Sequence, residues 1–214
     1  MLCLCAAVGA CAGALVYASA ALCADAPFRD VFSPRGCTLW ALFCAGLFAL
    51  LWGRCAGAPQ FALSAAAFCT MEFHSLTDYR SGYIYDSAAI ISFLTGLALR
   101  ALAGCWDGVL AALLGAAAGA APVVIVILLT RGGVGWGDAT MMAGLGAILG
   151  GRMALLALYA GVIAGGVAAL VLLVSGRVKR RDALPLAPFL LVGLTWALIF
   201  GPSFAARLGL RVSL

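Results

Sequence analysis

Long apolar stretches recur along the whole chain with only short polar segments between them, and they constrain the fold more than any other feature. A helix needs about 20 apolar residues to cross the hydrocarbon core of a bilayer, where its backbone groups must bond to one another. Hydrophobic residues make up 65% of the sequence and charged residues 10%, far from the values of soluble domains. The sequence therefore predicts an all-α fold, a polytopic transmembrane helical bundle.

The hydropathy divides into about eight membrane segments, which we expect to form a single integral membrane domain over residues 1–214. The segments run near residues 2–22, 37–53, 60–76, 87–105, 108–130, 139–151, 153–175 and 184–204. No Lys or Arg precedes the first segment, so it lacks the basic region of a secretory signal and is expected to be a retained span. The sixth segment is too short to cross unaided, and we expect it to be tilted or recessed behind its neighbours.

Basic residues predict the orientation, because short loops rich in Lys and Arg stay on the cytoplasmic side. The densest cluster lies at residues 177–181, and alternating outward from it assigns eight basic residues to the inside and five to the outside. The inner set is Arg29, Arg35, Arg80, Arg131, Arg177, Lys179, Arg180 and Arg181, and the outer set is Arg54, Arg100, Arg152, Arg207 and Arg211. No basic soluble face is evident, so nucleic acid is not an expected partner.

Two aspartates are the strongest candidates for function, since the chain has only eight acidic residues. Asp78 follows the third segment and Asp138 precedes the sixth, so the predicted alternation brings both to the cytoplasmic face. Carboxylates beside lipid are unfavourable unless they pair or line a cavity. In a paired site one carboxylate can draw a proton from water while the other, still protonated, bonds the carbonyl of a scissile peptide. Gly135 and Gly137, in the turn before Asp138, would allow close approach of a substrate backbone.

Simpler interpretations of the same residues remain open. Asp138 directly precedes the run Ala139–Met142 and could act only as a helix N-cap, while Asp78 could terminate a span and pair with Arg80. A non-enzymatic transporter or channel could use Asp138 with other acidic residues as an ion or proton path. The path would then include Glu72 and Asp107.

Other catalytic classes are disfavoured by the residues present. The chain has one histidine, His74, and its nine cysteines form no CxxC pair, so no metal and no cofactor are expected. The order Glu72-Phe73-His74 is not the HExxH motif of zinc peptidases, and no serine lies in a GxSxG turn. Glu72 and His74 are candidates for binding substrate or shaping the site, although Glu72 could instead face a polar seam between helices and His74 could lie only at the membrane interface.

Three blocks of sequence, in order, resemble the type IV prepilin peptidases. They are Asp78-Tyr79-Arg80-Ser81-Gly82-Tyr83-Ile84-Tyr85-Asp86, then Gly135-Trp136-Gly137-Asp138, then Leu184-Pro185-Leu186-Ala187-Pro188-Phe189-Leu190 with Gly193. The glycine-rich run 144–150 is also similar to the helix that follows the family's GxGD motif. The resemblance covers about residues 70–201.

This resemblance implies an aspartic endopeptidase of the bacterial cytoplasmic membrane that removes the basic leader from prepilins or pilin-like pseudopilins. Asp78 and Asp138 match the family's catalytic pair, which would face the cytoplasm, and Asp86 falls in its first motif. The expected partners are that substrate and membrane lipid. A related alternative is a GxGD protease that cuts within the bilayer, resembling presenilin-type enzymes.

The chain departs from the family pattern at three places. Longer members carry a cysteine-rich cytoplasmic domain with two CxxC pairs, and many also N-methylate the product. A short cytoplasmic loop at residues 23–36 stands here in place of that domain. We therefore do not expect N-methyltransferase activity. Tyr85 stands where the family commonly has Pro, and Thr140 where it often has Lys.

Overall fold

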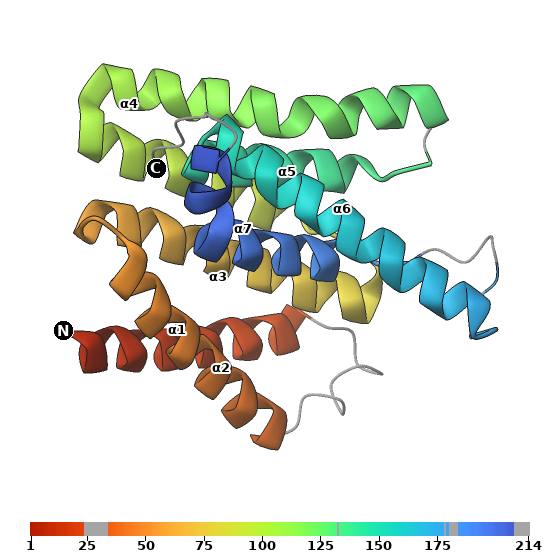
Figure 1. The fold of residues 1–214 in the computed structure, drawn as a ribbon, viewed down its shortest axis with the longest axis horizontal. Coiled ribbons are helices and arrows are strands. Elements are labelled where there is room, and N and C mark those ends of the chain that lie inside the picture. Colours follow the sequence, from red (N-terminus) through yellow and green to blue (C-terminus); the bar gives the residue numbers. More distant parts are fainter. Residues whose placement is uncertain (24–33, 132, 178, 180–183, 208–214) are drawn as a thin grey trace.

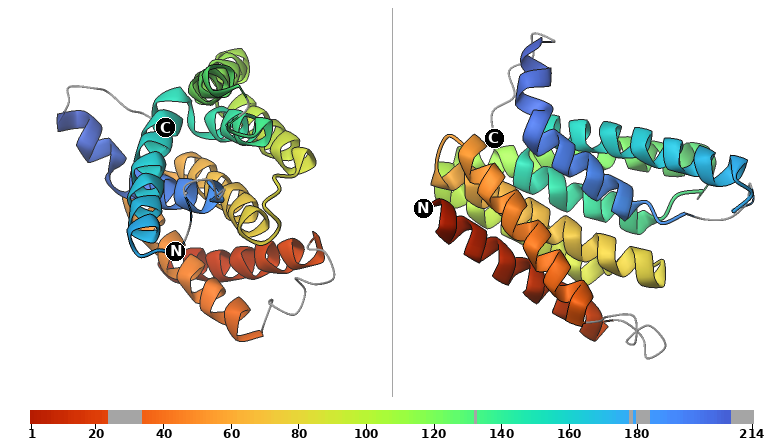
Figure 2. Two further views of the ribbon diagram at one scale, coloured as in Figure 1. Left: turned by 90° about the vertical axis from the view of Figure 1, so that its right-hand side faces the viewer. Right: turned by 60° about the horizontal axis from the view of Figure 1, so that its bottom comes forward.

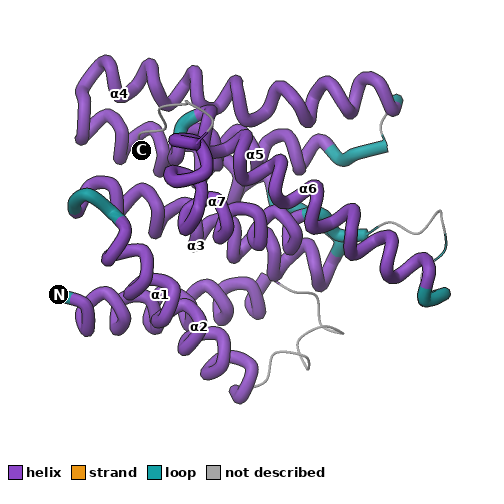
Figure 3. Tube along the Cα trace, viewed as in Figure 1, coloured by secondary structure: helices purple, strands orange, loops and turns teal. Residues whose placement is uncertain are grey.

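Helices account for almost all of the computed structural model, which describes residues 1–23, 34–131, 133–177, 179 and 184–207. Within those ranges short connections join the helices and no strand forms (Figure 3). The helices are α1 (Leu2–Cys23), α2 (Pro34–Arg54), α3 (Ala58–Ser81), α4 (Asp86–Thr130), α5 (Trp136–Leu149), α6 (Gly151–Val174) and α7 (Ala187–Arg207). The predicted all-α fold is confirmed.

The α4 helix contains two of the predicted segments. Its backbone leaves helical geometry at Gly104 and Cys105, where Cys105 has a φ of 47°, and the chain doubles back there (Figure 1). The two halves correspond to the predicted segments 87–105 and 108–130. Among the described residues, five helices, α1, α2, α4, α6 and α7, are long and apolar enough to cross a membrane. A multi-pass helical bundle is thus confirmed, but the count of eight membrane segments is not.

The helices α3, α5 and α7 form the interior of the bundle. In two views α1 and α2 lie at one edge and α4 at the other, with α3 and α7 between them (Figures 1 and 2). Most residues of the 14-residue α5 are buried, including Met142, Leu145 and Ile148. The sequence predicted that this short segment is tilted or recessed behind its neighbours, and its burial favours the recessed arrangement.

Glycine allows α5 to approach α4 this closely. A Cβ atom added to Gly115 of α4 would lie 2.2 Å from the carbonyl oxygen of Gly146 in α5, and one added to Gly146 would lie 2.1 Å from that of Gly115. Neither distance is possible for a real side chain, so the two backbones pack directly against each other. These glycines therefore form a helix-packing surface between α4 and α5.

An arginine from α4 satisfies the buried end of α5. The last four carbonyls of a helix have no partners within it, and at Leu149 they lie in the interior of the bundle. The Nε–H of Arg100 donates to the carbonyls of Ala147 at 3.1 Å and Ile148 at 3.0 Å. Arg100 was counted above only as a basic residue of the outer side, and the structure assigns it this capping contact.

The ends of the helices that carry the key aspartates gather at one end of the bundle. The C-terminus of α3 and the N-termini of α4, α5 and α7 all lie at the right of Figure 1, whereas the turn within α4 lies at the left. Asp78 and Asp138 thus reach the same end, as the alternation predicted. The predicted loop 23–36 lies mostly outside the described residues.

Candidate active site

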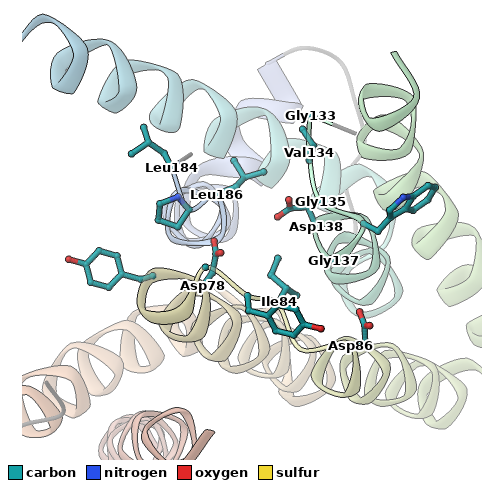
Figure 4. A pocket seen from close by; sticks show the side chains of 15 residues that line it. Asp78, Ile84, Asp86, Gly133, Val134, Gly135, Gly137, Asp138, Leu184 and Leu186 are labelled. Atoms are coloured by element: carbon teal, nitrogen blue, oxygen red, sulfur yellow. The ribbon is translucent and has the colours of Figure 1, made fainter. Parts of the chain in front are cut away.

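A pocket of about 710 Å³ opens where these helix ends meet. Three connections line it: residues 78–86 between α3 and α4, residues 133–138 before α5, and residues 184–186 before α7. These are the three blocks on which the family resemblance was based. Figure 4 shows the side chains of Asp78 and Asp138 pointing into the pocket from α3 and α5 respectively.

Asp78 lies in the last turn of α3 and is held by the beginning of α7. Gly82, in the left-handed conformation with a φ of 64°, ends α3 by donating its N–H to the carbonyl of Asp78 at 2.8 Å. The Asp78 side chain is 7% exposed, and its Oδ2 accepts the backbone N–H of Ala187 at 2.9 Å. The third sequence block therefore positions the first aspartate, a contact that sequence reasoning missed. The signal for it was Pro188, since proline favours the first turn of a helix.

Asp138 lies within the first turn of α5. The helix begins at Trp136 with Gly135 as its N-cap, so Asp138 is the third helical residue and makes no N-cap bond. The alternative that Asp138 serves as the N-cap is therefore wrong. Its backbone N–H donates to the carbonyl of Gly135 at 3.2 Å, and its side chain is left to face the pocket.

The two glycines of this turn have different steric roles. A Cβ on Gly137 would lie 2.9 Å from the Cβ of Ile84, so glycine is required for the two connections to pack. Gly135 has an extended backbone, with φ −72° and ψ 146°, that any residue adopts. A Cβ there would lie 3.6 Å from Oδ2 of Asp138, an ordinary contact. Both glycines line the pocket, and close approach of a substrate remains a prediction.

The surroundings favour a protonated form for at least one of the two carboxyls. Both carboxyls lie outside the five helices that are long and apolar enough to cross a membrane and outside the predicted span 60–76. Burial raises the pKa of Asp138 to about 6, and the negative charge of Asp78 contributes to this shift. Burial also raises the pKa of Asp78, although backbone hydrogen bonds from Ala187 and Leu186 oppose the change. Two carboxyls that influence each other in this way can share one proton near neutral pH.

The remaining candidates from the sequence separate into two groups. Asp86, the first residue of α4, is exposed and lines the pocket. Glu72 and His74 are buried in α3 and do not line it. Glu72 accepts hydrogen bonds from the indole of Trp40 and the thiol of Cys44, both in α2, so it belongs to a polar seam between helices.

His74 is only 1% exposed, and neither ring nitrogen has a hydrogen-bond partner among the described residues. Its side chain therefore faces the interior of the bundle, and its position relative to the membrane interface stays a prediction. The transporter interpretation required a path from Glu72 through Asp138 to Asp107. Asp107 follows the turn of α4 at the opposite end of the bundle, and Glu72 faces α2, so these residues form no such line.

Exposed aromatic residues surround the pocket. Tyr79, Tyr83 and Trp136 are 67%, 58% and 61% exposed and all belong to its lining. Tyrosine and tryptophan favour the membrane–water interface, because their rings are apolar and carry a polar group. These residues lie inside the sequence blocks quoted above, but their place at the pocket was not predicted. Among the described residues, no group of three His, Cys, Asp or Glu side chains is arranged to hold a metal ion.

The fold and the pocket define a class: polytopic helical membrane proteins with a pair of aspartates at one end of the bundle. Residues 63–170 match the type IV leader peptidase family. The chain belongs to this family.

Curated relatives agree with this family. The chain is 33% identical over 150 residues to a prepilin leader peptidase/N-methyltransferase of Bacillus subtilis, covering 67% of this chain and 60% of the relative. It is 32% identical over 170 residues to proteins of the same name from two strains of Burkholderia pseudomallei, covering 77% of this chain and 53% of each relative. The chain thus spans between half and three-fifths of the length of these relatives. No solved structure matches it.

Proposed function

We propose that this chain is an aspartic endopeptidase that removes the basic leader peptide from type IV prepilins or pilin-like pseudopilins. Asp78 and Asp138 are its catalytic pair. The observation that carries the proposal is that two carboxyls far apart in sequence, on α3 and α5, point into one pocket at the end of the bundle.

The reaction needs two carboxyls in different protonation states. One must be ionised to take a proton from water, and the other must be protonated to bond the scissile carbonyl. The raised pKa of Asp138 and the contribution of the Asp78 charge support such a pair. The remaining lining residues are mainly apolar, aromatic or glycine, which suits an extended peptide that enters beside the apolar segment of its own chain.

The location of the pocket supports cleavage at a membrane surface. The pocket lies at helix ends and not midway along the bundle, and exposed Tyr79, Tyr83 and Trp136 surround it. A prepilin with a cytoplasmic leader and a membrane-embedded apolar helix would present its scissile bond at this level. We assign the pocket to the cytoplasmic side of a bacterial inner membrane, in agreement with the excess of basic residues predicted for that side.

The decisive experiment is to incubate the purified protein with a prepilin and to sequence the new amino terminus. Asp78→Asn and Asp138→Asn should each abolish cleavage while leaving expression and membrane insertion unchanged. Asp107→Asn is the matched control, because Asp107 is exposed and does not line the pocket. Substantial leader removal by either pocket variant refutes the catalytic pair.

The position of the cut tests where the enzyme cleaves relative to the apolar helix of its substrate, and the mass of the product tests whether the new amino terminus is methylated. A cut at the boundary of the leader is the expected result, whereas a cut within the apolar helix would indicate a protease that acts inside the bilayer. We expect the new amino terminus to be unmethylated when S-adenosylmethionine is supplied, because residues 23–36 stand in place of the domain with the CxxC pairs. A methylated terminus contradicts that part of the proposal.

A further inference from the structure

The surroundings of the two carboxyls are unequal, and the difference originates at the beginning of α7. Asp78 accepts the N–H of Ala187 at 2.9 Å, and backbone hydrogen bonds from both Ala187 and Leu186 favour its ionised form. Leu186 precedes α7 and accepts the N–H groups of Phe189 and Leu190, so the amides that reach Asp78 belong to the unpaired first turn of that helix. A carboxylate that accepts such amides is stabilised as an anion.

Asp138 receives less support of this kind. It also lies in a first helical turn, but a single backbone hydrogen bond, from Gly135, favours its ionised form. The charge of Asp78 acts in the opposite direction and favours the protonated form. Burial affects both groups and therefore does not by itself distinguish them. The other titratable residues of the described lining are Tyr79, Tyr83 and Asp86, and none of them is basic.

We propose that the N-terminus of α7, through the backbone N–H of Ala187, fixes the roles within the pair, so that Asp78 is the ionised general base and Asp138 carries the proton. Ala187 acts as a positioning residue through its main chain and does not touch the substrate. The inference rests on the proposed peptidase function and adds a direction of proton transfer to it.

The assignment gives a balanced reaction. Asp78 takes a proton from water as the oxygen of that water bonds to the scissile carbonyl carbon, and Asp138 gives its proton to the carbonyl oxygen. The resulting gem-diol collapses when Asp78 passes its proton to the amide nitrogen and the C–N bond breaks. Asp138 then recovers a proton from a hydroxyl of the gem-diol, so a new carboxyl group and a new amine are released and the pair returns to its initial state.

Removal of the Ala187 donor tests the inference through the pH dependence of cleavage. In Ala187→Pro the N–H is lost, and the first position of a helix tolerates the fixed φ of proline. The acid limb of kcat/KM reports ionisation of the base and should move to higher pH by roughly one unit, since a donor to the anion is lost. Ala187→Val adds a similar volume but keeps the N–H, so its acid limb should stay at the position of the parent enzyme. An unmoved limb in the proline variant overturns the inference.

Chemical labelling of the unmodified protein provides a test that needs neither folding of a variant nor cleavage of a substrate. Epoxides alkylate ionised carboxylates, whereas diazo compounds esterify protonated carboxyl groups. We expect the epoxide ester on Asp78 and the diazo-derived ester on Asp138, mapped by mass spectrometry, with Asp86→Asn used to remove labelling at the third carboxyl of the pocket. The reverse assignment, or equal labelling of both residues by both reagents, overturns the inference. Absence of prepilin cleavage would instead refute the proposed function, and the labelling pattern would still be readable.

Discussion

The capping of α5 by Arg100 gives a prediction whose size follows from the structure. In Arg100→Met the side chain keeps an apolar body but loses its donors, so the carbonyls of Ala147 and Ile148 lose this partner. Both residues are fully buried, which limits access of water to these carbonyls. An unsatisfied buried carbonyl costs about 1–3 kcal/mol, so the loss of both contacts should reduce stability by roughly 2–6 kcal/mol.

Thermal unfolding in detergent measures this effect. For a chain of this length each kcal/mol corresponds to about 2–4 °C, so the melting temperature of Arg100→Met should fall by roughly 4–24 °C. Cleavage should fall as well, because α5 carries Asp138 at its other end. Arg207→Met is the matched control: the same change at an exposed residue at the end of α7 should leave the melting temperature nearly unchanged.

Equal melting temperatures of the Arg100 and Arg207 variants would contradict the reasoning. The carbonyls at the end of α5 would then find other partners without cost, and the position of the helix would not depend on the guanidinium. An intermediate value is expected for Arg100→Lys, because one ammonium cannot reproduce the planar donor group of arginine.

Three further outcomes follow from the described contacts. Gly137→Ala should lower cleavage at least tenfold, because the added Cβ would lie 2.9 Å from the Cβ of Ile84. Adding Ile84→Ala to that variant should restore part of the activity. Gly135→Ala should have a milder effect, because its added Cβ would lie 3.6 Å from Oδ2 of Asp138, an ordinary contact. Glu72→Gln should leave kcat/KM unchanged in a prepilin assay, since Glu72 faces α2 and not the pocket, and a large loss would show that it acts in the reaction. The raised pKa of Asp138 means that the folded state holds a proton more tightly than the unfolded state, so stability should decline as the pH rises from about 4 to about 6. The melting temperature should decline less over this range in Asp138→Asn than in the parent protein. An identical decline in both proteins would contradict the raised pKa of Asp138.

The predicted helices agree with the structure where an uninterrupted apolar run marks the segment. Segment 2–22 corresponds to α1 and segment 153–175 to α6, because uninterrupted apolar runs have one stable arrangement in lipid. The short length of α5 predicted a tilted or recessed helix, and the burial of most of its residues in the structure favours the recessed arrangement. The predicted segment 60–76 corresponds to α3, but its prediction as a membrane span is not confirmed. This helix carries the polar residues Glu72 and His74 and is not among the five helices that are long and apolar enough to cross.

The two acidic residues of the candidate site could be predicted from the sequence, whereas most of the contacts around them could not. Asp78 and Asp138 were found because carboxyls are rare in this chain and occur at the ends of apolar segments. For Glu72 the sequence left open whether it faces the site or a polar seam, because closeness to Asp78 along a helix does not ensure a shared face. Its hydrogen bonds from Trp40 and Cys44 turn it toward α2, away from the pocket.

The sequence by itself determined that the chain is a helical membrane protein, that Asp78 and Asp138 belong to the same end of it, and which family it belongs to. These conclusions depend on the hydropathy of the segments, on their alternation across the membrane and on the order of the motifs, all of which can be obtained without knowing how the helices pack. The tertiary structure decided that the amide of Ala187 bonds Asp78, that Ile84 packs on Gly137, and that Arg100 caps the buried end of α5. Each of these contacts joins segments more than 45 residues apart. It forms only when the helices pack, and the sequence around either residue does not indicate which residue it will contact.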